Sequence, residues 1–511
     1  MTYFNISIDD YEFTRSYSLF LLRFGFVYDI ILSVSADKKV IMMVIEMNKV
    51  YYEEITTVLD SFGLYKLFFK EKYSFFLDSG MDHSRLGRYS FIGANPFLKI
   101  ESKGEKIKIW EDGQQKEITG NPFHMLKKLL HKYAIKNSTA LPFIGGAVGY
   151  MAYDLCHHIE KLPQKAYDDT LLPEMIMGFY DGIIVIDHLE KKKYVVSAGL
   201  PHFREGQAKD KVKQLKKFIE DGEVLDSSYL NDAYRSNSIH FESNFTQQDY
   251  YKAIDKVREY IRCGDIYQMN MTQRFTTLIN RHPLNIYETL RTINPAPFAS
   301  FLAFEDFQIV SSSPERFLQI TKGMVETRPI KGTMPRGRTN KEDKTNSDIL
   351  KSSIKDRAEN LMIVDLMRND IGKVCKFGSV KVPELFCIEK YATVFHLVST
   401  VTGELREDCD AVDCIEATFP GGSITGAPKI RAMEIIDELE PTCRHLYTGS
   451  IGYIGFDGDM DLNIVIRTIL VKGDRAYYQV GGGIVWDSTP EKEYQETLDK
   501  GVALRKALSS T

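Results

Sequence analysis

Strand-like and helix-like segments follow one another irregularly along residues 245–508, and this order limits the folds open to the chain. Short alternating or apolar runs predict strands, and stretches with apolar residues every three or four positions predict helices. The predicted strands are 298–303, 307–312, 450–456, 462–471 and 476–485, and the predicted helices are 351–367, 411–418, 429–439 and 491–508. Charged residues crowd 335–349, which predicts an exposed loop. Because regular βαβ repetition is missing, we predict an α+β fold rather than a doubly wound sheet.

The composition is that of a globular protein and excludes several classes of partner. Of the 511 residues, 43% are apolar and 26% are charged, and the formal net charge is −5. We therefore expect neither nucleic acid nor an anionic membrane as a partner. Seven cysteines without a C-x-x-C pair predict neither a disulfide framework nor a zinc site. The apolar run 17–34 contains Arg23 and Asp29, so it fits neither a transmembrane span nor a signal peptide. We expect a cytoplasmic protein.

A polar, lysine-rich stretch at residues 203–243 is the best candidate for a boundary within the chain. It contains a helix-like segment at 206–221, followed by a cluster of Ser, Asn and Asp. A second helix begins where Thr246 and Asp249 form the pattern of a capping box, and it stops at Gly264. The predicted regions are 1–42 (an extension without an assigned role), 43–235 (an N-terminal region) and 245–508 (a C-terminal region).

Acidic residues on two predicted helices have two interpretations. Glu493, Glu496 and Lys500 share one helical face, and Glu359 interrupts a helix that otherwise looks buried. Spacing alone favours a surface ladder of salt bridges. The alternative is that one carboxylate from each helix binds a hard divalent cation, because Mg²⁺ usually takes one or two protein carboxylates.

Lys331 stands between Pro329 and Gly332, a rigid frame that a solvated lysine would not need. Most lysines only solubilise the surface. A lysine nucleophile must lose its proton from a reference pKa of about 10.4, which requires burial or nearby positive charge. Arg467, Lys500 and a bound metal are the candidate charges, and the sequence alone does not place them beside Lys331.

Eight motifs follow one another in the second half of the chain. They are SSSPERF (311–317), TRPIKGT (327–333), DRAENLMIVDLMRND (356–370), HLVSTV (396–401), FPGGSITGAPK (419–429), IRT (466–468), GGGIVWDS (481–488) and EYQETLDK (493–500). Together they resemble the chorismate-utilising enzymes, which include anthranilate synthase component I, aminodeoxychorismate synthase component I and the isochorismate and salicylate synthases. A looser match covers about 75–200. The resemblance implies an anthranilate synthase component I-like fold, in which the two regions jointly build large, stacked antiparallel sheets with flanking helices.

Two positions separate the branches of this family. Isochorismate and salicylate synthases carry a water-activating lysine at the position of Gln268, and glutamine has no basic lone pair for that task. The resemblance therefore implies an aminating enzyme. At the position of Lys331, anthranilate synthases typically carry alanine and aminodeoxychorismate synthases carry lysine. We predict the aminodeoxychorismate branch, which serves 4-aminobenzoate and folate biosynthesis. The alternatives are anthranilate synthase component I of tryptophan biosynthesis and a non-catalytic chorismate-binding homologue.

The resemblance also implies roles for single residues. Glu315 matches the general acid that protonates the departing 4-hydroxyl of chorismate, and Lys331 matches the nucleophile that attacks ring C2 before ammonia adds at C4. Glu359 and Glu496 match ligands of Mg²⁺, and Arg467 matches a bidentate partner for a carboxylate. The remaining residues that match substrate-binding positions are Gly332, Thr333, His396, Tyr447, Gly481, Gly482, Gly483 and Lys500.

Two further molecules are implied besides chorismate and ammonia. One is tryptophan, in a buried site for which a plain apolar core is the alternative. The residues of that site would be Ser79, Arg88, Tyr89, Ser90, Phe91, Pro297, Phe298 and Ala299. The other is a glutamine amidotransferase subunit (component II), because no cysteine of this chain lies in a G-x-C-x-G elbow. Free ammonium should substitute for that subunit.

Overall fold

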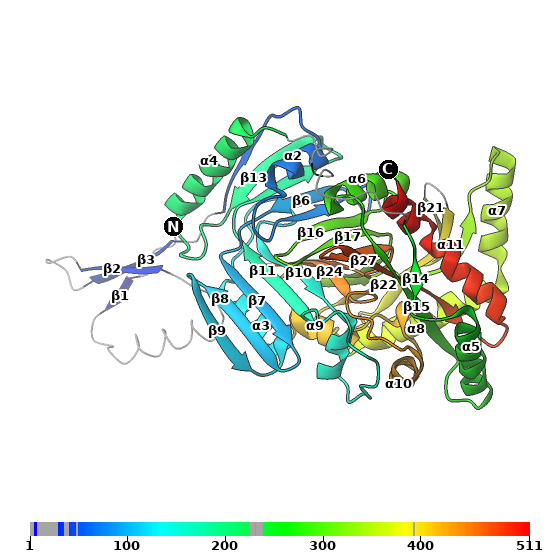
Figure 1. The fold of residues 1–511 in the computed structure, drawn as a ribbon. Helices are drawn as coiled ribbons and strands as arrows, with labels where there is room; N and C mark the ends of the chain where they lie inside the picture. The colour runs from blue at the N-terminus through cyan, green and yellow to red at the C-terminus, as the bar shows by residue number, and fades with distance from the viewer. Residues whose placement is uncertain are drawn as a thin grey trace.

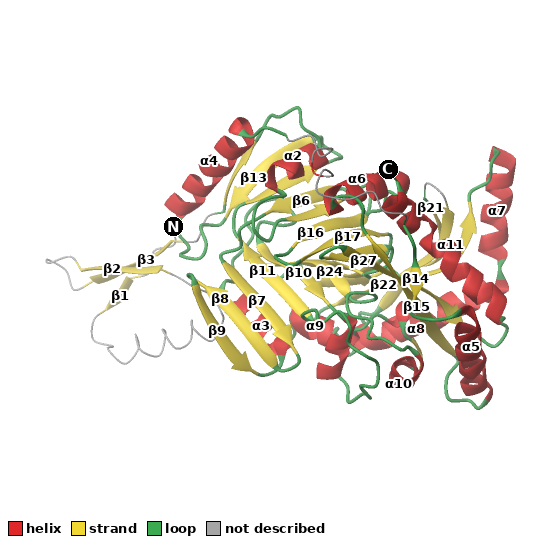
Figure 2. Ribbon diagram, viewed as in Figure 1, coloured by secondary structure: helices red, strands yellow, loops and turns green. Residues whose placement is uncertain are grey.

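Two large antiparallel sheets form the body of the protein, and helices flank them (Figures 1 and 2). The computed structural model describes residues 5–7, 29–34, 40–46, 50–224, 230, 239–391 and 394–510. Within these residues each large sheet has 12 strands. The predicted α+β fold with large antiparallel sheets is confirmed.

The first sheet contains the strand of Lys331. In order across the sheet, its strands are β20 (Ile330–Pro335), β22 (Val394–Glu404), β19 (Met324–Thr327), β18 (Arg316–Thr321), β25 (Met460–Asn463), β24 (Ser450–Gly455), β10 (Gly146–Met151), β11 (Met175–Tyr180), β7 (Leu98–Lys103), β8 (Lys106–Glu111) and β9 (Gln114–Thr119). A twelfth strand, β21 (Lys381–Lys390), pairs with β22.

The second sheet contains the strand with the three consecutive glycines. In order, its strands are β14 (Glu242–Ser243), β15 (Gln268–Leu278), β27 (Arg475–Ile484), β26 (Thr468–Lys472), β17 (Phe307–Ser313), β16 (Phe298–Ala303), β5 (Phe75–Asp78), β6 (Tyr89–Gly93), β12 (Ile183–Asp187), β13 (Lys192–Ser197) and β4 (Tyr51–Glu54). The short β23 (Gly426–Ala427) pairs with β15.

Both halves of the chain contribute strands to each large sheet, as the resemblance implied. The boundaries at 43–235 and 245–508 stay a prediction. Part of the predicted extension 1–42 lies outside the described residues. The part that is described joins a third, three-stranded sheet of β1 (Asn5–Ser7), β3 (Val40–Glu46) and β2 (Asp29–Val34).

Two apolar cores hold the layers together. The smaller packs four helices onto the second sheet: α2 (Ser61–Phe68), α4 (Glu205–Asp221), α6 (Pro283–Ile293) and α11 (Pro490–Ser509). The larger joins residues of both sheets with five helices: α3 (Pro122–Lys132), α5 (Gln247–Arg262), α8 (Ile354–Gly372), α9 (Ala411–Thr418) and α10 (Lys429–Leu439). β10 and β11 are buried along their whole length, which explains their continuous apolar sequences.

Local sequence signals account for most of the helices. The Thr246 hydroxyl accepts a hydrogen bond from the Asp249 backbone N–H, so α5 begins at the predicted cap. The predicted helix at 206–221 is α4. The loop predicted over 335–349 is wrong, because residues from 340 onward form α7 (Asn340–Ser352). The Thr339 hydroxyl caps this helix by accepting from the Glu342 N–H, and its charged residues are exposed except Asp343, which is buried and pairs with Arg336.

The strand predicted over 462–471 is also wrong in one respect. It divides into β25 and β26, and the four residues between them are not in a strand. Arg467 has φ of 54°, a left-handed conformation that a continuous strand does not allow. The break occurs at a residue that the resemblance assigns to the substrate.

Candidate active site

Lys331 lies on an irregular strand at the edge of the first sheet. The register of β20 against β22 shifts between Ile330 and Thr333, and Gly332 in this bulge has φ of 87°. A Cβ atom on Gly332 would stand 2.9 Å from the Cβ of Asp356 in α8, so only glycine lets the strand approach the helix so closely. The lysine is therefore held between a sheet edge and α8.

The surroundings of Lys331 favour its neutral amine. Desolvation lowers the pKa of Lys331, and the Lys500 ammonium lowers it further. Three carboxylates, Glu359, Glu315 and Glu496, oppose this shift through their charge. The structure thus brings together the lysine, both predicted metal ligands and the predicted general acid. Of the charges suggested by the sequence, Lys500 acts on Lys331.

Glu315 is buried at the junction between β17 and β18. Its backbone N–H donates to the Ser313 hydroxyl, and its carbonyl accepts from the Ile464 N–H. Its carboxylate accepts a hydrogen bond of 3.4 Å from the Ile330 N–H, next to Lys331. Burial raises the pKa of Glu315, whereas Ser423 and the Lys331 charge lower it. A carboxyl group in this environment can keep a proton at higher pH than an exposed one, as a general acid requires.

The carboxylates of α11 face the glycine-rich end of β27, and Glu359 of α8 is near enough to Glu496 for their charges to interact. A Cβ atom on Gly482 would lie 3.1 Å from Glu496 Oε1 and 3.2 Å from Glu493 Oε2. Burial raises the pKa values of Glu359 and Glu493. Burial also opposes ionisation of Glu496, but the Lys500 ammonium, 2.7 Å away, lowers its pKa. Glu496 and Lys500 form the ion pair expected from the salt-bridge interpretation of α11, with side chains 48% and 35% exposed, whereas Glu493 beside them is buried.

These carboxylates offer the hard oxygen donors that Mg²⁺ prefers. The glycines of β27 beside them carry no side chains that would fill the space. Across the described parts of the chain, no three His, Cys, Asp or Glu side chains are grouped as a metal site. A magnesium site with two protein ligands does not need such a group, because water and substrate oxygens complete the octahedron. Glu359 and Glu496 therefore fit the cation, and the assignment stays a prediction.

Polar side chains from several elements line another side of the site. The Thr333 hydroxyl and His396 Nδ1 are 3.0 Å apart. Burial lowers the pKa of His396 to about 3, helped by the Arg467 charge. The Arg467 guanidinium donates to the Lys500 carbonyl, and Tyr447 is near enough for its charge to act on it. The predicted substrate-binding residues thus lie around one location.

The three glycines of β27 leave room for the reacting groups. Gly481, Gly482 and Gly483 pair with β15, and the Gly481 carbonyl accepts a 2.8 Å hydrogen bond from Lys500 Nζ. A Cβ atom on Gly483 would stand 2.9 Å from Gln268 Nε2 and 3.5 Å from Lys331 Nζ. The two residues that separate the branches by sequence are therefore neighbours.

Sequence reasoning missed two residues of this location. Ser423 is hydrogen-bonded to Glu315, and Asp356 lies against Gly332. Nothing in their spacing pointed to the site. Glu493, which the sequence placed on the same helical face as Glu496 and Lys500, is buried beside Glu496.

The residues predicted to bind tryptophan come together where β5, β6 and β16 meet. The Ser79 hydroxyl donates to the Tyr89 carbonyl at 2.6 Å, and it lies 3.4 Å from the Pro297 carbonyl. The Arg88 side chain instead pairs with Asp187 at 2.7 Å. Tryptophan binding stays a prediction.

Comparison with known proteins identifies the family. The model of the chorismate binding enzymes matches residues 73–506. Anthranilate synthase component 1 of Acetivibrio thermocellus is 43% identical over 454 residues, which cover 87% of this chain and 92% of that protein. Aminodeoxychorismate synthase component 1 of Escherichia coli (strain K12) is 42% identical over 429 residues, which cover 83% and 90%. Relatives of both branches are therefore more than 40% identical to this chain.

The fold agrees with a solved relative. Anthranilate synthase component I from Streptococcus pneumoniae TIGR4 aligns with a TM-score of 0.72 and 34% identity, covering 81% of this chain and 91% of that one. The menaquinone-specific isochorismate synthase MenF of Escherichia coli shares the fold at a TM-score of 0.66 and 15% identity, covering 97% and 100%. The predicted anthranilate synthase component I-like fold is thereby confirmed. Among the helices that the structure describes, none is long and apolar enough to cross a membrane.

Proposed function

Because the chain belongs to the family of chorismate binding enzymes, we propose that it is an aminodeoxychorismate synthase component 1, which forms 4-amino-4-deoxychorismate from chorismate and ammonia. The observation that carries this proposal is the position of Lys331 beside Gln268, close enough to Glu359 and Glu315 for their charges to act on its amine. An amine in this place can act as a nucleophile, and the glutamine cannot activate water.

The reaction proceeds in two substitutions on the ring. Glu315 gives its proton to the 4-hydroxyl, which leaves as water while the neutral Lys331 amine forms a bond to C2 and passes a proton to the Glu315 carboxylate. Ammonia then bonds to C4, and the C2–nitrogen bond to Lys331 breaks as that amine takes a proton from Glu315, which is replaced by the proton that the new ammonium group loses. Two substitutions with double-bond shifts place the new amine on the carbon that lost the hydroxyl. The enolpyruvyl ether remains on the product.

The other residues of the site bind and orient the substrate. Arg467 holds one carboxylate of chorismate, and the Gly481–Gly483 backbone allows close approach of the ring. Glu359 and Glu496 would hold Mg²⁺, whose positive charge would offset the ring carboxylate. Ammonia would come from glutamine through a separate amidotransferase subunit, in keeping with the designation of the relatives as component 1.

A second candidate function is favoured by the Acetivibrio thermocellus relative and by the solved structure, both anthranilate synthases. That activity adds ammonia at C2 and eliminates pyruvate. Lys331 argues against it, because a lysine bonded to C2 would occupy the carbon that ammonia must reach.

Product analysis by mass spectrometry tests the proposal. The purified chain is incubated with chorismate, Mg²⁺ and ammonium, without a lyase. We expect aminodeoxychorismate with the pyruvyl group retained, and a loss of at least about 100-fold in its formation by Lys331→Ala. A Lys351→Ala variant, in the exposed α7, is the control. Anthranilate with free pyruvate from the starting protein would refute the proposal and support the second candidate.

A further inference from the structure

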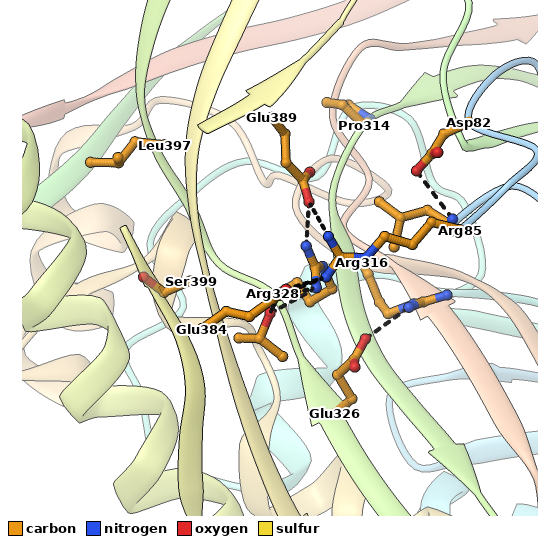
Figure 3. Close-up of polar contacts among 12 residues, drawn as sticks. Asp82, Arg85, Pro314, Arg316, Glu326, Arg328, Glu384, Glu389, Leu397 and Ser399 are labelled. Atoms are coloured by element: carbon orange, nitrogen blue, oxygen red, sulfur yellow. Dashed lines mark hydrogen bonds and ion pairs between the residues drawn. The ribbon is translucent and has the colours of Figure 1, made fainter. Parts of the chain in front are cut away.

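Two arginines, Arg85 and Arg328, and two glutamates, Glu384 and Glu389, form a compact charged cluster (Figure 3). Arg85 Nη2 lies 2.7 and 2.6 Å from the two carboxylate oxygens of Glu384 in β21. Arg328 donates to Glu384 Oε2 at 2.9 Å and also to Glu389. Arg85 reaches Glu389 as well, at 3.7 Å. We call these four residues the arginine–glutamate cluster.

Arg85 lies in the N-terminal half of the chain, on a turn that several hydrogen bonds stabilise. Asp82, with φ of 55°, accepts the backbone N–H groups of Arg85 and Gly87 at its carbonyl. Its carboxylate accepts from the Leu86 N–H at 3.1 Å. His83 adds a hydrogen bond of 2.9 Å to the Ser79 carbonyl. The turn therefore presents Arg85 to β21 in a defined place, although half of its side chain is exposed.

Arg328 connects the cluster to Lys331. It lies three residues before the lysine, and its side chain is only 4% exposed. Besides the two glutamates, its guanidinium donates to the Thr400 hydroxyl of β22 at 2.7 Å. The next residue, Pro329, accepts a hydrogen bond from the Ser399 N–H. The segment that leads into Lys331 is thus fixed to β21 and β22 through Arg328.

Tyr391 connects the same cluster to Glu315 and to the substrate wall. Its hydroxyl lies 3.4 Å from Glu389 Oε2 and 3.3 Å from the carbonyl of Pro314, the residue before Glu315. Its ring stands edge-on to His396, with 4.9 Å between centroids. A displacement of Glu389 would therefore shift Arg328, which precedes Lys331, and Tyr391, which contacts the residue before Glu315.

The cluster is neutral only while Arg85 is present. Its charges alternate, and the groups that face the two carboxylates are Arg85, Arg328, Thr400 and Tyr391. Burial would raise the pKa of Glu384, but Thr400, Arg85 and Arg328 together hold it at about 2. Without Arg85, Arg328 would face two carboxylates alone, and one of them would have to take a proton or turn to water.

We propose that Arg85 is a positioning residue, which acts through the arginine–glutamate cluster to hold Lys331 and Glu315 in their reactive placement. This inference rests on the proposed roles of those two residues. A half-exposed arginine in the N-terminal half of the chain thereby controls chemistry that takes place on the C-terminal half.

The variant Arg85→Ala tests the inference, because truncating a half-exposed side chain leaves no buried cavity. We expect kcat for chorismate consumption to fall by between about 10- and 100-fold, with KM nearly unchanged, because misplacement of reacting groups acts on the chemical step. The pH–rate profile should change as well, because the pKa of Lys331 depends on its burial and on the charges placed around it. Arg85→Lys should restore part of kcat. Arg262→Ala, which removes an exposed pair with Glu259, is the matched control.

A second readout does not depend on turnover. The rate at which acetic anhydride acylates Lys331, followed by peptide mass mapping, reports the exposure and protonation of its amine. We expect this rate to change in Arg85→Ala and not in Arg262→Ala. The inference is overturned if Arg85→Ala keeps the starting kcat, pH profile and acylation rate, or if only its melting temperature falls. Because chorismate consumption is measured whatever the product, a wrong product would refute the proposed function and leave this test intact.

Discussion

Burial moves the pKa values of Glu315 and Lys331 toward each other. The proposed reaction needs the carboxyl group protonated and the amine neutral at the same time. In water these forms coexist in a very small fraction of molecules, because a carboxyl group titrates near pH 4 and an amine near pH 10. Raising one pKa and lowering the other enlarges that fraction at neutral pH.

Gly482 is the residue at which a single methyl group should disturb the proposed metal site. In Gly482→Ala the new Cβ would be 3.1 Å from Glu496 Oε1, so the carboxylates must shift by a few tenths of an ångström. We expect the Mg²⁺ concentration for half-maximal activity to rise about tenfold, without loss of folding. A magnesium titration of the rate measures it. Gly372→Ala, with no atom within 4 Å of its Cβ, is the control. An unchanged titration in Gly482→Ala would count against Mg²⁺ beside this glycine.

At the scale of elements, sequence signals predicted the helices that depend only on residues near one another in the chain. The cap at Thr246 and the periodic apolar residues of α5 need only neighbours in sequence, and the structure contains that helix. The helix within 335–349 was missed because its many charged residues are typical of an exposed loop, and Thr339 was not recognised among them as a helix cap. The break at Arg467 was missed for a different reason. Its apolar neighbours predict a strand. The partners of the left-handed residue come from distant segments: its carbonyl accepts from the Ser312 N–H of β17, and its guanidinium donates to the Lys500 carbonyl of α11.

The α8–α10 junction tests how a buried ion pair fixes the loop that carries Ser423. Lys429 and Lys373 each lie 3.0 Å from the buried Asp370, but their side chains are 13% and 52% exposed. We expect Lys429→Met to cost about 3 kcal/mol of unfolding free energy, because breaking a buried pair leaves Asp370 undercompensated. Lys373→Met should cost less than about 1 kcal/mol. Urea denaturation compares the two, and equal losses would show that burial does not matter at this junction.

At the scale of the whole molecule, the sequence identified the members of the site but not their arrangement. Motifs named Glu315, Lys331, Glu359 and Glu496, which come from separate segments of the chain. Their proximity depends on β20, α8 and α11 meeting beside β27, and no spacing within one element encodes that. The same holds for Arg85, whose partners in β21 are about 300 residues away. Contacts between segments so far apart in the sequence are known only from the structure.

The stability of the whole fold should respond to pH through a histidine at the start of α6. Burial lowers the pKa of His282 to about 4, whereas an unfolded chain has a value near 6.5. Above pH 6.5 both states are neutral at this residue, so it contributes no slope. Between about pH 6.5 and 4 the unfolded chain binds a proton that the folded one rejects, so stability falls as pH falls.

The variant His282→Asn isolates this contribution. His282 Nδ1 accepts from the Leu284 N–H at 3.1 Å, and asparagine can keep this helix cap without titrating. We expect the difference in unfolding free energy between variant and starting protein to move in the variant's favour by up to about 1 kcal/mol per pH unit below pH 6.5. Urea denaturation between pH 8 and about 5 measures it. His124→Asn, at a side chain 73% exposed, is the control. A curve for His282→Asn parallel to that of the starting protein would mean that its imidazole takes up a proton equally in both states.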